Sequence, residues 1–300
     1  MLGTIFGKTA DLLDKRFLVG LLLPCVGFHA ALAALLVTAL GWDDARQLVA
    51  TIPSPERWFL AVAAAAVVLV FAVLLGTQIN TLMRWWEGYW RPRCARTPGA
   101  AVQRWRYGRL DDEDPWDSTQ MLREYPRETA DFLPTRLGNA LLAAENYSRD
   151  RYGLDSVLFW PRQYLLLTDT IRTVVDDARR AIDQFIVIAS LSVLTAIITT
   201  GMGIAGQLTD RVWIPTGLGA AGLALVTYRS AVREAITFGD LVRSVYDLYR
   251  RDLLAALGVA AAVTPEDERR LWKALGQYLF RGATDSGDEA LIRYIPPQKS

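Results

Sequence analysis

The 300-residue sequence has one histidine and two cysteines, which leaves few side chains that could bind a transition metal or form disulfides. His29 lies four residues after Cys25 and shares a helical face with it, but two candidate ligands do not make a metal site. A lone histidine near Pro24 in an apolar segment is typical of hydrogen-bonded packing. The sequence therefore predicts no metal, no cofactor and no structural disulfide.

Catalytic and nucleotide-binding signatures are also absent. The sequence contains no Walker loop, no GxSxG and no HExxH, and the glycines of "GMGIAG" (201–206) end an apolar run instead of following a strand. They favour a turn or a close approach of two helices. No segment alternates apolar and polar residues over any length, and no 20–50-residue repeat is visible. We therefore predict an all-α protein that is not an enzyme.

Charged residues are missing from four long stretches. A helix rises about 1.5 Å per residue and the hydrocarbon core is about 30 Å thick, so 26 residues can span it with some tilt. A soluble protein would have to bury three such runs in one modest chain. The stretches are Phe17–Trp42, Trp58–Met83 and Gln184–Thr209, each 26 residues long, and the 17-residue Val212–Tyr228, whose flanking Arg211 and Arg229 can snorkel. The sequence predicts a polytopic membrane protein with four transmembrane helices, arranged as two hairpins, and a helical cytoplasmic region.

Lysine and arginine predict the orientation of these spans. With four spans, 30 of the 33 basic residues fall on one side, so we expect both termini and the large middle segment to be cytoplasmic. The predicted domains are an N-terminal segment with the first hairpin (1–83), a cytoplasmic helical insert (84–183), the second hairpin (184–228) and a cytoplasmic helical tail (229–300).

Aromatic and basic residues crowd the inner end of the second predicted span. Tryptophan favours the membrane interface, and an arginine cluster attracts anionic headgroups at roughly 1 kcal/mol per residue. A nucleic-acid surface is the alternative, but "DDEDPWD" (111–117) follows with five carboxylates, and residues 84–183 balance at sixteen basic and sixteen acidic. We therefore expect contact with an anionic bilayer and not with nucleic acid. The predicted interface residues are Trp85, Trp86, Trp90, Arg91, Arg93 and Arg96.

Two polar stripes interrupt the apolar spans. Such groups are costly in hydrocarbon and should face protein or water, so the stripes either line a pore or hold helices together. No acidic residue lies inside any span, which argues against a proton- or sodium-driven transporter. The stripes are Thr77, Asn80, Thr81 and Arg84 in the second span, and Ser192, Thr195 and Thr199 in the third.

Helix signals outside the spans predict the rest of the chain. Proline, glycine and the acidic run argue against long elements between Pro92 and about Thr119, and a helix is expected over 133–153. After Pro161, the stretch 168–185 should enter the third span as one helix, and the fourth span should continue into the tail. Amphipathic helices are expected over 238–258 and over 264–282, where Thr264 is the expected cap.

Two segments, "TRLGNALLAAENYSRDRYGLDSVLFWPRQY" (135–164) and "FGDLVRSVYDLYRRDLLAALG" (238–258), resemble a family of uncharacterised bacterial membrane proteins. The resemblance implies a bacterial inner-membrane location and no particular activity. "RWWEG" (84–88) resembles a stretch that follows the second span of bacterial bestrophins, which are pentameric anion channels. The order of two hairpins around a helical insert is also similar, whereas Pro92, Pro98 and the acidic run depart from their unbroken helix. This likeness implies a pore lined by the second span.

The sequence leaves two functions open. The first is a homo-oligomeric channel-like protein with helices from the second span around an axis and a cytoplasmic helical vestibule. The second is a membrane-anchored scaffold whose cytoplasmic helices bind a protein partner. For both functions, we expect anionic lipid and further copies of the chain as partners.

Overall fold

The computed structural model describes residues 17–91, 96–283 and 289–295, and this part of the chain is all-α, as predicted. It contains eleven α-helices, α3 to α13, and one isolated bridge between Val259 and Tyr294. The chain divides into two compact units. The first comprises Met1–Trp85 with Arg180–Ala231, and the second comprises Trp86–Arg179 with Val232–Ser300.

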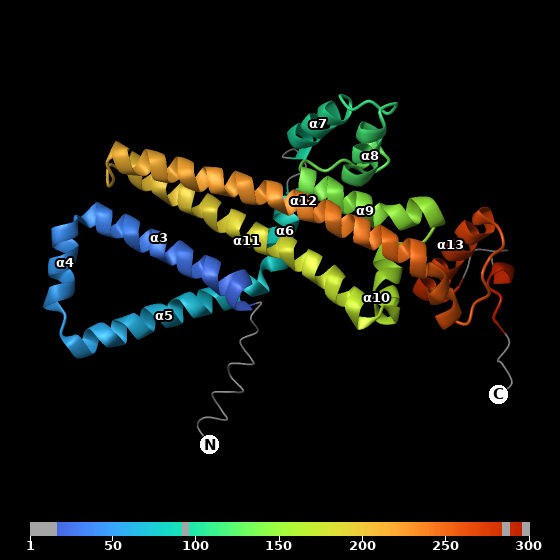
Figure 1. Cartoon of the computed structure of the whole chain (residues 1–300), viewed down its shortest axis with the longest axis horizontal. Helices are drawn as coiled ribbons and strands as arrows, with labels where there is room; N and C mark the ends of the chain where they lie inside the picture. The colour runs from blue at the N-terminus through green and yellow to red at the C-terminus, as the bar shows by residue number, and fades with distance from the viewer. Residues whose placement is uncertain (1–16, 92–95, 284–288, 296–300) are drawn as a thin grey trace, which may run out of the picture. The chain divides into compact units, whose positions relative to one another are not determined.

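The first unit contains a pair of apolar helices, α3 (Leu23–Leu40) and α5 (Ser54–Thr77), joined by the short α4 (Trp42–Thr51). A π-helical turn, Leu18–Leu22, precedes α3. The two apolar helices converge at one end, where Cys25 and Phe28 pack against Ala72, and they diverge toward α4 (Figure 1). Most of α5 is therefore left without a packing partner among the described residues.

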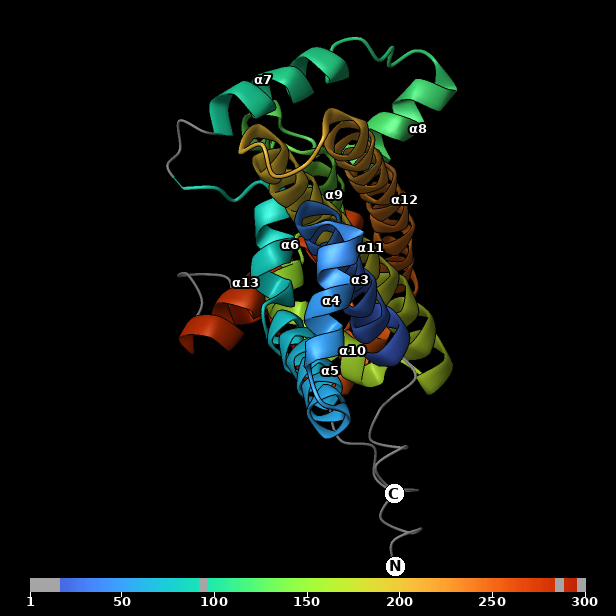
Figure 2. The same ribbon diagram turned by 90° about the vertical axis from the view of Figure 1, so that its left-hand side faces the viewer.

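The same unit contains a second pair, formed by parts of α11 (Asp169–Ile204) and α12 (Asp210–Ala256), which lie side by side in both views (Figures 1 and 2). As predicted, neither helix is interrupted. The turn between them depends on two glycines. Gly206 has a φ of 72°, and a Cβ at Gly203 would lie 2.3 Å from Cγ of Trp213, so no side chain fits there.

Three helical segments are long and apolar enough to cross a membrane, namely Leu18–Leu40, Ser54–Thr77 and Asp169–Ile204. They support a multi-pass membrane protein. The predicted fourth run, Val212–Tyr228, lies inside α12 but is not among these segments. It is shorter than the other three, and three glycines and a proline reduce its hydropathy.

The second unit includes α7 (Arg96–Tyr107), α8 (Pro115–Glu124), α9 (Arg136–Tyr152), α10 (Ser156–Leu166) and α13 (Pro265–Arg281). The expectation of irregular chain before Thr119 was wrong, because α7 and most of the first turn of α8 lie there. Pro98 and Pro115 stand in first turns, where the missing N–H has no helical partner to lose. The side chain of Asp114 caps α8 by accepting from the backbone N–H of Trp116 at 2.7 Å.

A hydrophobic core joins α9, α10, α12 and α13 within this unit. Phe159, Tyr246 and Trp272 are fully buried in it, and the rings of Phe159 and Trp272 meet edge to face with centroids 5.1 Å apart. Both ends of α13 form as predicted. The Thr264 hydroxyl accepts from the N–H of Asp267 at the start of the helix, and Gly282 adopts a φ of 74° at its end.

Candidate functional site: the polar faces of the apolar helices

The first polar stripe lies where α5 ends and α6 (Ile79–Glu87) begins. The expectation of one helix through Met83 was wrong, because Gln78 leaves the helical region with φ −96° and ψ 4°. The Thr77 hydroxyl donates to the carbonyl of Leu74 at 2.7 Å, and a side chain that bonds its own backbone in this way favours a helix end. Thr77 therefore belongs to a different helix from Asn80, Thr81 and Arg84.

All four side chains of this stripe are exposed. The helix that leads to them is also largely uncovered, since only 6% of the apolar window of α5 is buried, against 33% for that of α11. The helices that the structure describes therefore do not shield the stripe. If α5 crosses a bilayer, another copy of the chain, water or lipid headgroups must meet these polar groups.

The second stripe lies inside the first unit. Ser192, Thr195 and Thr199 are all buried. The Thr195 hydroxyl donates to the carbonyl of Leu191 at 2.8 Å, whereas that of Thr199 has no hydrogen-bond partner among the described residues. This burial favours helix packing over pore lining for the second stripe.

The predicted interface residues follow directly after the first stripe. Trp85 is 57% exposed and Arg91 is exposed, whereas Trp86, Trp90 and Arg96 are half-buried. Arg96 begins α7, donates from Nε to the carbonyl of Trp90 at 2.8 Å and lies over the ring of Tyr89. Arg96 therefore has a structural role within the second unit besides any contact with lipid. Arg93 and Cys94 lie outside the described residues.

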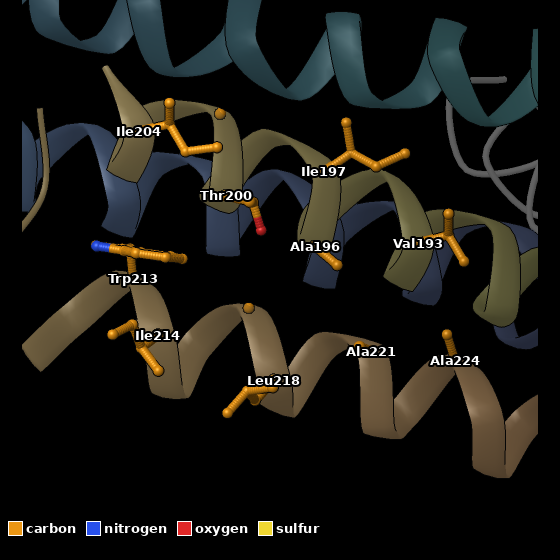
Figure 3. Close-up of a pocket in the computed structure, with 12 residues that line it drawn as sticks. Val193, Ala196, Ile197, Thr200, Ile204, Trp213, Ile214, Leu218, Ala221 and Ala224 are labelled. Carbon is orange, nitrogen blue, oxygen red and sulfur yellow. The ribbon is translucent and has the colours of Figure 1, made fainter. Parts of the chain in front are cut away.

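An apolar groove of about 880 Å³ runs between α11 and α12 in the first unit (Figure 3). Small residues such as Ala196, Gly217 and Ala221 line the groove and leave it unfilled, and Thr200 supplies a hydroxyl directed toward α12. This groove was not predicted from the sequence, although the recurrence of glycine and alanine along α12 was its signal. The groove leaves an uncovered apolar surface between the two helices.

His29 packs as the sequence suggested. Its Nδ1 lies 2.8 Å from the carbonyl oxygen of Cys25, and its ring meets those of Phe28 and Phe71 edge to face. No group of three or more histidine, cysteine, aspartate or glutamate side chains that could hold a metal occurs in the described part of the chain.

Comparison of the chain with protein-family models, with curated proteins and with solved structures found no match. Inferences about function therefore depend on the exposed polar face and the uncovered helix before it.

Proposed function

We propose that this chain is a multi-pass inner-membrane protein that assembles with copies of itself into a channel-like pore. The exposed polar face at the end of α5 and in α6 carries the proposal. Its members, Thr77, Asn80, Thr81 and Arg84, are exposed, and only 6% of the apolar window of α5 is buried in the described part of the chain. Copies arranged with these faces toward a shared axis would give the polar groups water and would bury the apolar flanks of α5.

The proposal includes a fourth span, formed by Val212–Tyr228 within α12. This run pairs side by side with α11, a helix that is apolar enough to span the bilayer. With this fourth span, 30 of the 33 basic residues lie on one side of the membrane, which agrees with the positive-inside rule. Both termini are then cytoplasmic.

A scaffold role is the second candidate, and exposed aromatic side chains in the second unit favour it. Trp116 is 77% exposed and Phe280 is 79% exposed. Large exposed aromatic side chains are typical of protein-binding surfaces. In this case the spans would only anchor and associate the chains.

Cysteine accessibility separates the two functions. After replacement of Cys25 and Cys94, Thr81→Cys in reconstituted protein should react with a small charged thiol reagent, and the adduct should change ion flux. Val73→Cys is the matched control, because Val73 is an exposed apolar residue of α5 and should face lipid or a neighbouring helix without reacting.

The opposite pattern would contradict the pore. If Thr81→Cys does not react and Asn80→Leu weakens association of the chains without an effect on flux, the stripe only holds helices together. Interhelical hydrogen bonds are worth about 0.6–2 kcal/mol each, so that substitution should loosen an assembly and not abolish it.

A further inference from the structure

A groove with a basic rim lies between α10 and α13 in the second unit. Its volume is about 660 Å³, and Val157, Leu158 and Phe280 contribute apolar lining. Val157 is 70% exposed and Phe280 is 79% exposed, so the described chain leaves this lining open. Lys273 and Arg281 of α13 lie on the same groove. It therefore offers apolar contact with cations beside it.

The positive charges of this groove are mostly uncompensated. Lys273 and Arg281 are exposed, and neither forms an ion pair with another described residue. Arg149 approaches Asp150 only at 3.7 Å, in an exposed pair of little strength. Asp155 also lines the groove, but its carboxylate caps α10 by accepting from the N–H of Val157 and of Leu158. An acidic partner would therefore fit the groove.

The same chain displays such a partner at the start of α8. The loop Asp111–Asp117 contains five carboxylates, and its Trp116 is 77% exposed. Hydrogen bonds within the loop hold its shape, since the Asp117 carboxylate accepts from the N–H of Asp111 and Asp114 caps the helix. The carboxylates of Asp112 and Glu113 have no ion-pair partner in the described chain. An aromatic side chain flanked by free acids complements an apolar groove flanked by free cations.

Within one chain, the acidic loop Asp111–Asp117 and the groove between α10 and α13 lie toward opposite ends of α9. The loop leads into α8, which is tied to the start of α9 by the ion pair between Glu124 and Arg136 at 2.6 Å. The groove lies at the other end of α9, where Arg269 of α13 donates to the carbonyl of Arg151. The 17 residues of α9 cover about 25 Å. The loop and the groove are thus free to meet only between copies.

We propose that the groove between α10 and α13 binds Trp116 and the acidic loop of a second copy of this chain. Such a contact joins two different surfaces, so repeated copies form a ring if the rotation between them closes. Trp116 would be the buried anchor, and Asp112 and Glu113 would pair with Lys273 and Arg281 around it. The proposal rests on the self-assembly proposed above but does not require a pore.

Photo-crosslinking of the full chain in detergent tests the contact. A benzophenone amino acid in place of Trp116 should give crosslinked dimers on irradiation, with the crosslink in the peptide that contains residues 273–281. The same probe in place of Val263, which is 96% exposed, is the matched control and should give few dimers at that peptide. Crosslinks only within one chain, only to lipid or detergent, or to another region of the second copy would overturn the proposal.

Charge exchange gives a second and independent readout. The pair of changes Lys273→Glu and Arg281→Glu should reduce crosslinking at this site about tenfold or more, because close like charges repel across an interface. Added Asp112→Lys and Glu113→Lys should restore it. All four residues are exposed, so the fold should tolerate these changes. Failure of the second pair to restore crosslinking would count against the proposed charge pairing.

Filling the groove tests the apolar part. A Cβ at Gly276 would meet Phe159 and Leu158 at ordinary contact distances of 3.6 and 3.8 Å, so Gly276→Leu should extend into the groove without disturbing the helix. Crosslinking from position 116 should then fall. Unchanged crosslinking in this variant would show that Trp116 does not enter the groove. Because none of these readouts measures ion flux, a failed pore and a failed contact remain distinguishable.

Discussion

Asp247 of α12 accepts hydrogen bonds from two tyrosines of α9. Tyr147 donates at 3.0 Å and Tyr152 at 2.6 Å. Arg250, one turn later, covers the ring of Tyr152 at 4.2 Å and pairs with Glu268 of α13 at 2.9 Å. Three helices of the second unit thus depend on a small group of polar side chains, in addition to their apolar core.

Removal of this acceptor should destabilise the protein. We expect Asp247→Ala to cost about 1–3 kcal/mol, because two half-buried hydroxyls lose their partner. Asp252→Ala is the matched control, since Asp252 is an exposed acid on the same helix. Thermal unfolding of the full chain in detergent measures both. Equal melting temperatures for the two variants would argue against a structural role for Asp247.

Alkaline pH should weaken the same contact. Burial, together with the hydrogen bond to Asp247, raises the pKa of Tyr147 above its ordinary value of 10.0. The unfolded chain therefore releases this proton first as pH rises, and the stabilisation that is present below about pH 10 is lost above it. The melting temperature should fall between pH 9.5 and 11.5, and it should fall less in Tyr147→Phe. An identical pH profile in the variant would contradict this assignment.

At the scale of whole elements, the turn between α11 and α12 depends on the absence of a side chain at Gly203. Trp213 occupies that space and donates from Nε1 to Asp210 at 2.8 Å. Gly203→Ala should force the ring out and cost about 1–3 kcal/mol. Gly201→Ala is the control, because a Cβ there meets nothing within 4 Å.

A double-mutant cycle of unfolding free energies tests the contact directly. In a Trp213→Ala background, the destabilisation caused by Gly203→Ala should largely vanish. Additive effects would refute the contact.

Capping residues were the most reliable local signals in the sequence. Thr264 and Gly282 bound α13 as expected, since a hydroxyl that accepts from an N–H and a residue with positive φ act locally. Proline was ambiguous, because the same residue can end one helix or stand in the first turn of another, and Pro98 and Pro115 stand in first turns here. The break at Gln78 has no proline to reveal it, so hydropathy alone extended α5 too far.

At the scale of the whole molecule, the number of spans follows from which residues share a side of the membrane. Single cysteines at Ser54, Asp112, Gln207 and Val263 report on three successive connections and the tail. Ser54 is the first residue of one apolar segment and Gln207 follows another by three residues, whereas Asp112 and Val263 lie far from all three. With four spans, Ser54 and Gln207 should label from one side, and Asp112 and Val263 from the other. If Gln207 and Val263 label from the same side, α12 does not cross the bilayer and the count is three.

The residue patterns predicted the all-α class and three of the four expected apolar spans, because each of these depends on one segment at a time. The exposure of Asn80 and Thr81 and the burial of Thr195 and Thr199 could not be predicted in the same way. Both stripes place threonines at helical spacing in an apolar run, although the first also contains Asn80 and Arg84. Whether such a face is covered depends on the packing of neighbouring helices. Complementary surfaces such as the acidic loop and the α13 groove likewise need the folded chain before they can be compared.

Three glycines of the second unit meet at one close junction and form a spacing pattern in the sequence. Pro134 lies where a Cβ at Gly88 or at Gly99 would be, at 2.3 and 2.4 Å, and the carbonyl oxygen of Glu87 lies 2.1 Å from the Cβ position of Gly138. Any larger residue would require the backbone to separate at this junction. Along the chain, 10 residues separate Gly88 from Gly99, 34 separate Gly99 from Pro134, and 3 separate Pro134 from Gly138. A search for other chains with this spacing and with apolar helices on either side would therefore select for this junction, even where overall identity is too low to align.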